Sequence, residues 1–212
     1  MMSDKSVSRS VRGEPVRQRV LDAAERLLRQ GKADFSMRDL AAEAGVSFAT
    51  PFNRFGSKIA IMHALSARRI ASMEARLSSA ALTGDAIDRI FFTAEIAASV
   101  MLLEPVVNRA VMGSLGAPGS APGAVMEQSA RLWSAALDRG EGLADAWRSR
   151  GLAILPAQLA FGFRGILSFW TAGELTDTDL APAARRMVAT LMLGFADRRR
   201  RPALIEAVSP IF

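Results

Sequence analysis

Cysteine is absent from this 212-residue chain, and histidine occurs once, as His63. Without cysteine the chain can form neither a disulfide framework nor a cysteine-ligated zinc site, and a single histidine argues against a histidine-ligated metal. A chain without disulfides suits a reducing compartment. We therefore expect a cytoplasmic protein that holds no metal and no cofactor.

Long uninterrupted hydrophobic runs are also absent. Residues 1–19 are polar and basic and lack the apolar stretch of an export signal, so we expect residues 1–13 to form a flexible basic arm. The most apolar stretch, residues 152–170, contains Pro156, Gln158 and Arg164. These residues interrupt the roughly 20 apolar positions that a membrane-spanning helix needs, so we expect a buried helix and no membrane binding.

Strand-like alternation is scarce, no internal repeat is visible, and helix-forming residues dominate, so the sequence predicts an all-α protein. Apolar residues from Val20 to Leu28 recur at helical spacing and predict a first helix from about Pro15 to Gln30. Beyond residue 80 the same spacing predicts helices at about 85–103, 105–112, 121–139, 152–172 and 178–197.

The excess of positive over negative charge is confined to one part of the chain. Residues 1–80 contain 14 Lys and Arg against 8 Asp and Glu, whereas the remaining 132 residues contain 13 of each kind. The whole net charge of +6 therefore lies in the N-terminal third. Such a distribution is expected if this third faces a polyanion.

Local signals after Phe35 predict a short helix that ends in a tight turn. Ser36 can cap this helix, Asp39 can complete a capping box, and Phe35 can pack against Leu40. Gly45 can adopt the left-handed conformation that terminates a helix.

A third helix is expected from Phe48 to Phe55, capped by Ser47, and a long fourth helix from Lys58 towards Ser79. Two short helices joined by a tight turn, with an apolar helix behind them, form a helix-turn-helix. The outer side of the third helix can then enter a DNA major groove.

Several side chains of this segment suit contacts with DNA. The methyl group of Thr50 can touch thymine, and its hydroxyl can donate or accept a hydrogen bond. Arg38 can fork onto guanine O6 and N7 or clamp a phosphate, and Lys58 suits a phosphate as a point charge.

The segment Phe35-Ser-Met-Arg-Asp-Leu-Ala-Ala-Glu-Ala-Gly-Val-Ser-Phe-Ala-Thr-Pro-Phe-Asn-Arg-Phe-Gly-Ser-Lys58 resembles the DNA-binding signature of the TetR family of regulators. The resemblance covers about residues 14–66, and the rest of the chain is similar to the family only in the number and order of its helices. It implies a DNA-binding domain at residues 14–60 and a helical effector-binding and dimerisation domain at 61–212. The DNA-binding residues that it implies are Ser36, Arg38, Ser47, Phe48, Ala49, Thr50, Phe52, Asn53, Arg54 and Lys58.

Three positions depart from the family pattern. Phe52 stands where the family often has a tyrosine, so a phenolic bond to phosphate is not available, and Pro51 replaces an aliphatic residue. Phe48 is unusually large and apolar for a groove-facing position. It either presses against a thymine methyl group or turns inward and contributes nothing to DNA reading.

The charge-neutral remainder is rich in Phe, Met and Trp. Most of these residues are expected in the core, but flexible Met side chains also line adaptable pockets, so a subset can receive a hydrophobic effector. For each polar candidate, an exposed or internally paired side chain is the alternative. The ligand-binding candidates are Phe91, Glu95, Met101, Asn108, Met112, Met126, Trp133 and Gln158.

Small residues beside large apolar ones in the last two long helices permit close helix packing. Together with the family resemblance, they indicate a four-helix dimer interface. The interface candidates are Phe161, Gly165, Phe169, Met187, Leu191 and Gly194. The run Arg198–Arg201 is expected as the solvated basic end of the last helix.

These expectations combine into a homodimeric regulator, by default a repressor, that binds a palindromic operator in double-stranded DNA and is released by a small hydrophobic or amphipathic effector. One alternative is a regulator without an effector. The other is a helical lipid or small-molecule carrier without specific DNA binding. An enzyme is not expected, because no set of nucleophile, base and orienting residue occurs at a recognisable spacing.

Overall fold

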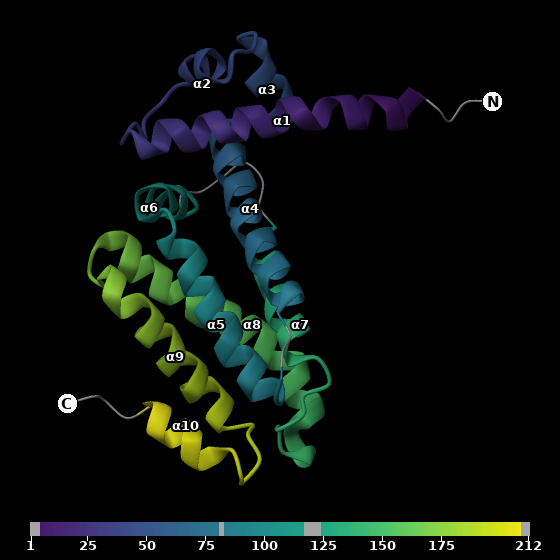
Figure 1. The fold of residues 1–212 in the computed structure, drawn as a ribbon, viewed down its shortest axis with the longest axis vertical. Helices are drawn as coiled ribbons and strands as arrows, with labels where there is room; N and C mark the ends of the chain where they lie inside the picture. The colour runs from purple at the N-terminus through teal and green to yellow at the C-terminus, as the bar shows by residue number, and fades with distance from the viewer. Residues whose placement is uncertain (1–4, 81–82, 117–123, 209–212) are drawn as a thin grey trace.

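The computed structural model describes residues 5–80, 83–116 and 124–208, and these residues form a succession of helices without a named strand (Figure 1). The all-α prediction is confirmed. The helices are α1 (Lys5–Arg29), α2 (Met37–Ala44), α3 (Ala49–Phe55), α4 (Lys58–Ser79), α5 (Ala86–Leu102), α6 (Pro105–Ser114), α7 (Val125–Leu137), α8 (Asp145–Ala172), α9 (Asp177–Leu193) and α10 (Arg201–Val208).

The N-terminal helices form one end of the molecule. In Figure 1, α1 runs across this end with α2 and α3 on its outer side, and α4 leads away towards the other helices. The apolar stripe of α1, including Val20 and Leu27, packs with Phe35 and Leu40 into a first hydrophobic core. This core fixes α2 and α3 against α1.

A second, larger core lies between α5, α7, α8 and α9 and is centred on the fully buried Trp133 and Trp170. Helix α4 belongs to both cores, because Ile61 and Leu65 pack in the first and Met73 in the second. The domain boundary expected at residue 60 therefore falls inside a continuous helix. The two halves of the molecule share this helix as their connection.

Helix α6 also joins the two halves. Its side chains Val107 and Val111 complete the first core beneath α1. The following residue along the chain, Met112, packs against the second core. A shift of α6 would therefore act on both cores.

Several helix ends differ from the sequence prediction. Helix α1 begins at Lys5 and continues through Pro15, so the segment expected as an arm is helical from Lys5 onward. Helix α8 begins at Asp145 and not near Leu152, directly after the turn at residues 140–144. Arg148, in the first turn of α8, donates hydrogen bonds to the carbonyl groups of Gly140 and Leu143 in this turn.

The basic run Arg198–Arg201 was predicted wrongly as the end of a helix. Helix α9 stops at Leu193, because the next residues pair with the turn before α8: the Ala144 N–H donates to Phe195 O and the Asp197 N–H to Gly142 O. The Asp197 carboxylate then accepts from the N–H groups of residues 199 and 200. Arg201 opens the additional helix α10.

Helix α8 is long and apolar enough by length and composition to cross a membrane. It nevertheless packs against α7 and α9 and buries Leu159, Phe163 and Trp170 in the second core. Core helices of soluble proteins pass the same test. The opposite side of α8 is exposed and bears Phe161 and Phe169.

Candidate nucleic-acid interface and helical-domain cavity

The start of α2 is held by the predicted capping box. The Ser36 hydroxyl oxygen accepts from the Asp39 N–H at 3.1 Å, and the Asp39 carboxylate accepts from the Ser36 N–H at 2.9 Å and its hydroxyl at 2.8 Å. These bonds favour the charged carboxylate and lower the pKa of Asp39. The Ser36 hydroxyl, a predicted DNA contact, is thus engaged within the protein.

The end of α2 is a left-handed turn at Gly45, which has φ 61° and ψ 42°. The Gly45 N–H donates to Ala42 O at 3.1 Å, and the Val46 N–H donates to Ala41 O at 3.0 Å. This is the Schellman arrangement, in which the last carbonyl groups of a helix are satisfied by the residues of the turn. It fixes the direction in which the chain enters α3.

The start of α3 corrects one prediction. Ser47 does not cap the helix; the N-cap is Phe48, which has helical dihedral angles and makes no side-chain capping bond. The Ser47 hydroxyl instead lies 2.7 Å from the hydroxyl of Thr50. Pro51 is buried in the first turn of the helix, where its missing N–H costs little.

The outer side of α3 is exposed to solvent. Ala49, Asn53 and Arg54 are exposed, while Phe48 and Phe52 show 59% and 57% of their surface. Phe48 therefore faces outward, which decides between the two orientations considered for it. Large apolar side chains at this exposure are available to a partner.

Basic side chains of this domain lie over aromatic rings. The guanidinium carbon of Arg38 lies 5.6 Å from the centre of the Phe48 ring, a cation-π distance that brings α2 and α3 side chains together. The ammonium of Lys58, at the start of α4, lies 4.5 Å from the centre of the Phe35 ring. Burial lowers the pKa of Lys58, and the nearby carboxylate of Asp34 opposes this shift.

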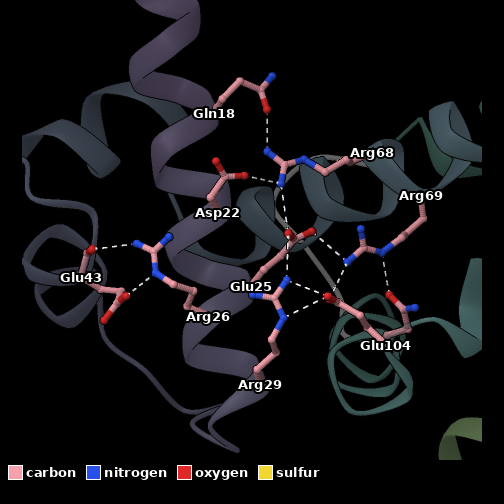
Figure 2. A network of polar contacts seen from close by, with 10 residues as sticks. Gln18, Asp22, Glu25, Arg26, Arg29, Glu43, Arg68, Arg69 and Glu104 are labelled. Carbon is pink, nitrogen blue, oxygen red and sulfur yellow. Dashed lines mark hydrogen bonds and ion pairs between the residues drawn. The ribbon is translucent and has the colours of Figure 1, made fainter.

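A network of ion pairs joins α1 to α4 (Figure 2). Its centre is Glu25, which is 7% exposed and whose carboxylate lies 3.2 Å from Arg68 and 2.8 Å from Arg69. Arg68 also bonds Asp22 at 2.7 Å. A carboxylate this deeply buried depends on its cationic partners.

The same network reaches α6. Glu104, just before α6, accepts from Arg29 of α1 at 2.7 Å and lies 3.5 Å from Arg69. Arg69 also donates to the buried Asn108 side chain at 2.8 Å, and Asn108 donates in turn to Met101 O at 2.8 Å. Arg69 thus connects α1, α4 and α6.

A cavity of about 330 Å³ lies directly below this network. It is lined mainly by apolar side chains of α4, α6, α7 and α8, together with Met101 of α5. Arg69 and Asn108 form part of its wall, so the network and the cavity share residues. The volume lies at the lower end of the range for small-molecule sites.

The ligand-binding candidates divide into two groups. Met101, Asn108, Met112, Met126 and Trp133 line the cavity. Phe91 and Glu95 do not; both lie instead beside Arg185 of α9, which is 4.8 Å from the Phe91 ring centre and 3.2 Å from the Glu95 carboxylate. Gln158 lies on the exposed side of α8.

The dimer candidates also divide. Phe161, Gly165 and Phe169 follow one another at four-residue intervals along the exposed side of α8, and Gly194 is exposed at the end of α9. Met187 is instead used within the chain: a Cβ atom at Gly162 would lie only 2.8 Å from it. Leu191 is half-buried beside the same glycine.

Of the polar side chains of the cavity wall, sequence reasoning assigned Asn108 and missed His63, Ser66, Arg69, Ser129 and Arg164. Arg164 could have been identified as a candidate from the sequence, because it is an arginine inside the most apolar stretch of the chain. Arg69 gave no such signal, because its partners come from helices that are distant in the sequence.

Residues 20–65 match the family model for bacterial regulatory proteins of the tetR family. The whole chain is similar to the crystal structure of a TetR transcriptional regulator from Rhodococcus sp. RHA1, with a TM-score of 0.66, 21% identity and coverage of 84% of this chain and 97% of that one. A protein of unknown function from the same organism gives a TM-score of 0.55 at 25% identity, covering 86% and 96%. A proposed transcriptional regulator from Streptomyces coelicolor A3(2) gives 0.50 at 25% identity, covering 92% and 98%. A comparison with curated proteins finds no match.

Proposed function

By its N-terminal domain the chain is a member of the TetR family of DNA-binding regulators, and we propose that it acts as a homodimeric repressor. Its operator is palindromic, each half being read by one copy of α3, and a small effector in the cavity releases the DNA. The regulator acts in the cytoplasm and carries out no catalysis.

The observation that carries the proposal is the exposed side of α3. Phe48, Ala49 and Asn53 are open to solvent, and Arg38 lies against the Phe48 ring. A small residue between two exposed aromatic rings allows close approach to base edges, and the rings suit thymine methyl groups. A helix of this shape, fixed by its two predecessors, fits a major groove.

Dimerisation uses the exposed side of α8. Phe161 and Phe169 show 55% and 58% of their surface, a large apolar exposure on the side of α8 that faces away from the second core. Gly165 lies between them, and a Cβ atom there would meet nothing within 4 Å. A second copy of α8 can approach closely at this glycine, and a two-fold axis then presents two α3 helices to the two operator halves.

Effector control uses the residues that the cavity and the ion network share. A ligand that displaces Arg69 or Asn108 changes the contacts of Glu25 and Glu104, which hold α1 against α4 and α6. The effector weakens DNA binding by the difference between its affinities for the two arrangements.

The test begins with selection of genomic fragments that bind the purified full chain, followed by titration of the selected sequence against random DNA at several salt concentrations. Arg38→Ala should cost about 1–3 kcal/mol of binding free energy and relax the sequence preference. Lys58→Ala should weaken all sequences alike and reduce the salt dependence. Equal behaviour of the two variants would contradict the assigned roles.

Arg139→Ala is the matched control, because Arg139 is exposed in the turn after α7 and lies neither on α3 nor on the α8 surface assigned to dimerisation. It should bind the operator like the parent chain. If the parent chain binds selected and random DNA equally while the cavity still takes hydrophobic compounds, the protein is a carrier and not a regulator.

A further inference from the structure

None of the polar side chains that the structure describes in the cavity wall is acidic. The polar residues that line the cavity are His63, Ser66, Arg69, Asn108, Ser129 and Arg164, and no Asp or Glu of the described residues does. The described wall thus carries two guanidinium groups and no carboxylate, inside a largely apolar enclosure where charge interactions are strong.

The two arginines differ in how their charge is balanced. Arg69 lies 2.8 Å from Glu25 and 3.5 Å from Glu104, so carboxylates outside the cavity neutralise it. Arg164 forms no ion pair with any described residue. Its recorded partners are the sulfur and the carbonyl oxygen of Met112, both at the 3.5 Å limit of a hydrogen bond.

Arg164 is therefore a half-buried cation without a counterion in the described part of the chain. Among the segments whose side chains are not described, residues 81–82, 117–123 and 209–212 contain no acidic side chain, and residues 1–14 contain only Asp4 and Glu14. Burial lowers the pKa of Arg164, which records the cost of holding this charge away from water. Arginine stays charged in such a position, so the charge needs a partner.

A second unsatisfied group lies in the same wall. Trp133 is fully buried, and its indole N–H has no hydrogen-bond partner among the described residues. A buried donor without a partner is destabilising, and an acceptor atom of a ligand can satisfy it. The rest of the wall, including Met73, Leu132 and Phe163, is apolar.

We propose that the effector is an amphipathic organic anion whose carboxylate pairs with Arg164 and whose apolar chain or ring fills the space between Met73, Leu132 and Phe163. Arg164 is the residue that determines this specificity. The inference rests on the proposed effector function and adds the chemical class of the ligand.

Pairing of Arg164 with an anion also bears on α6. The guanidinium now contacts Met112 of α6, and Asn108, one turn earlier, is bound to Arg69. A carboxylate that draws Arg164 away from Met112 loosens α6 at the point where this helix meets the ion network. The specificity residue on α8 and the route to α1 therefore meet at α6.

The test compares octanoate, octan-1-ol and octylammonium, which share one chain length and differ in the charge of the head group. Calorimetric titration of the full chain should show octanoate binding about ten- to a hundred-fold more tightly than octan-1-ol, with octylammonium the weakest. Arg164→Met should remove the preference for octanoate and keep the affinity for octan-1-ol. Arg164→Lys should retain much of the preference, and the exposed control Arg139→Met should retain all of it.

Equal binding of octanoate and octan-1-ol, tighter binding of octylammonium, or a preference that survives Arg164→Met overturns the inference while leaving the effector site in place. Failure of all three probes to bind overturns it together with the effector part of the proposed function. Operator binding measured on the same preparations without probe reports separately on the DNA-binding part, and the thermal unfolding midpoint checks that each variant is folded.

Discussion

Ion pairs border both cores, but the first core, around α1 and α2, is small, whereas the second core, around Trp133 and Trp170, is large. The aromatic residues Trp133 and Phe163 of the second core line the cavity, so this core leaves room for a ligand. A small core buries a smaller fraction of its surface and provides less stabilisation. The N-terminal helices must therefore be fixed by other means.

Those means are specific local contacts. A capping box starts α2, a left-handed glycine ends it, and the Glu25 network holds α1 to α4. The second core can rely on the number of its apolar contacts and can tolerate an unfilled volume. The difference indicates that precise orientation matters at α3, while adaptability matters at the cavity.

The largest effect expected from this comparison follows removal of the Glu25 carboxylate. Glu25→Ala leaves Arg68 and Arg69 without their shared partner in a largely buried position. Breaking a buried ion pair from one side should lower the free energy of unfolding by about 3 kcal/mol. Urea denaturation of the full chain at fixed protein concentration measures the loss.

Glu127→Ala is the matched change in the other half of the molecule. Glu127 pairs with Arg131 one turn later on α7 at 2.7 Å, but both side chains are mostly exposed. Its removal should cost no more than about 0.5 kcal/mol. A loss for Glu25→Ala as small as this would show that the N-terminal helices do not depend on the network.

An intermediate effect is expected at the turn after α2. Gly45→Ala places a side chain at φ 61°, where no atom would clash but the backbone is strained, and should cost about 1–2 kcal/mol. Gly113→Ala in α6 is the opposite case: its backbone is helical, and the new methyl group would contact only Thr171, at 3.6 Å. It should stabilise the chain by about 0.5–1 kcal/mol in the same denaturation assay. Effects of equal sign would contradict the special role of the turn.

The predictability of the fold follows the same division. The bounds of α2 and α4 could be predicted closely because their signals are local: a serine cap, a turn glycine and a serine before Lys58. The start of α8 and the existence of α10 could not, because both depend on backbone bonds between residues 142–144 and 195–197, which are distant in the sequence.

The candidate site divides likewise. The outward side of α3 could be predicted from helical spacing alone, although the orientation of Phe48 could not. The cavity wall could be predicted for the Met and Trp residues, since apolar residues at helical spacing face inward. Arg69 and Arg164 could not be predicted as part of the wall, because the sequence alone does not show whether a charged side chain has its partner within the fold.

The smallest expected effect is the loss of stabilisation by the α2 capping box at acid pH. Because its hydrogen bonds with Ser36 lower the folded-state pKa of Asp39 below the ordinary value of 3.8, the carboxylate stabilises the fold fully above that value and loses this contribution as the pH falls through the lower one. The thermal midpoint of Asp39→Asn should therefore lie below that of the parent chain at neutral pH, and the gap should narrow only below pH 3.8. Ser36→Ala keeps the backbone N–H bond to Asp39 and loses the hydroxyl bond, so its own profile should show a weaker acid dependence than the parent chain. A gap that stays constant into the acid range would mean that these bonds do not favour the charged carboxylate, and that α2 is held by packing in the way the second core is.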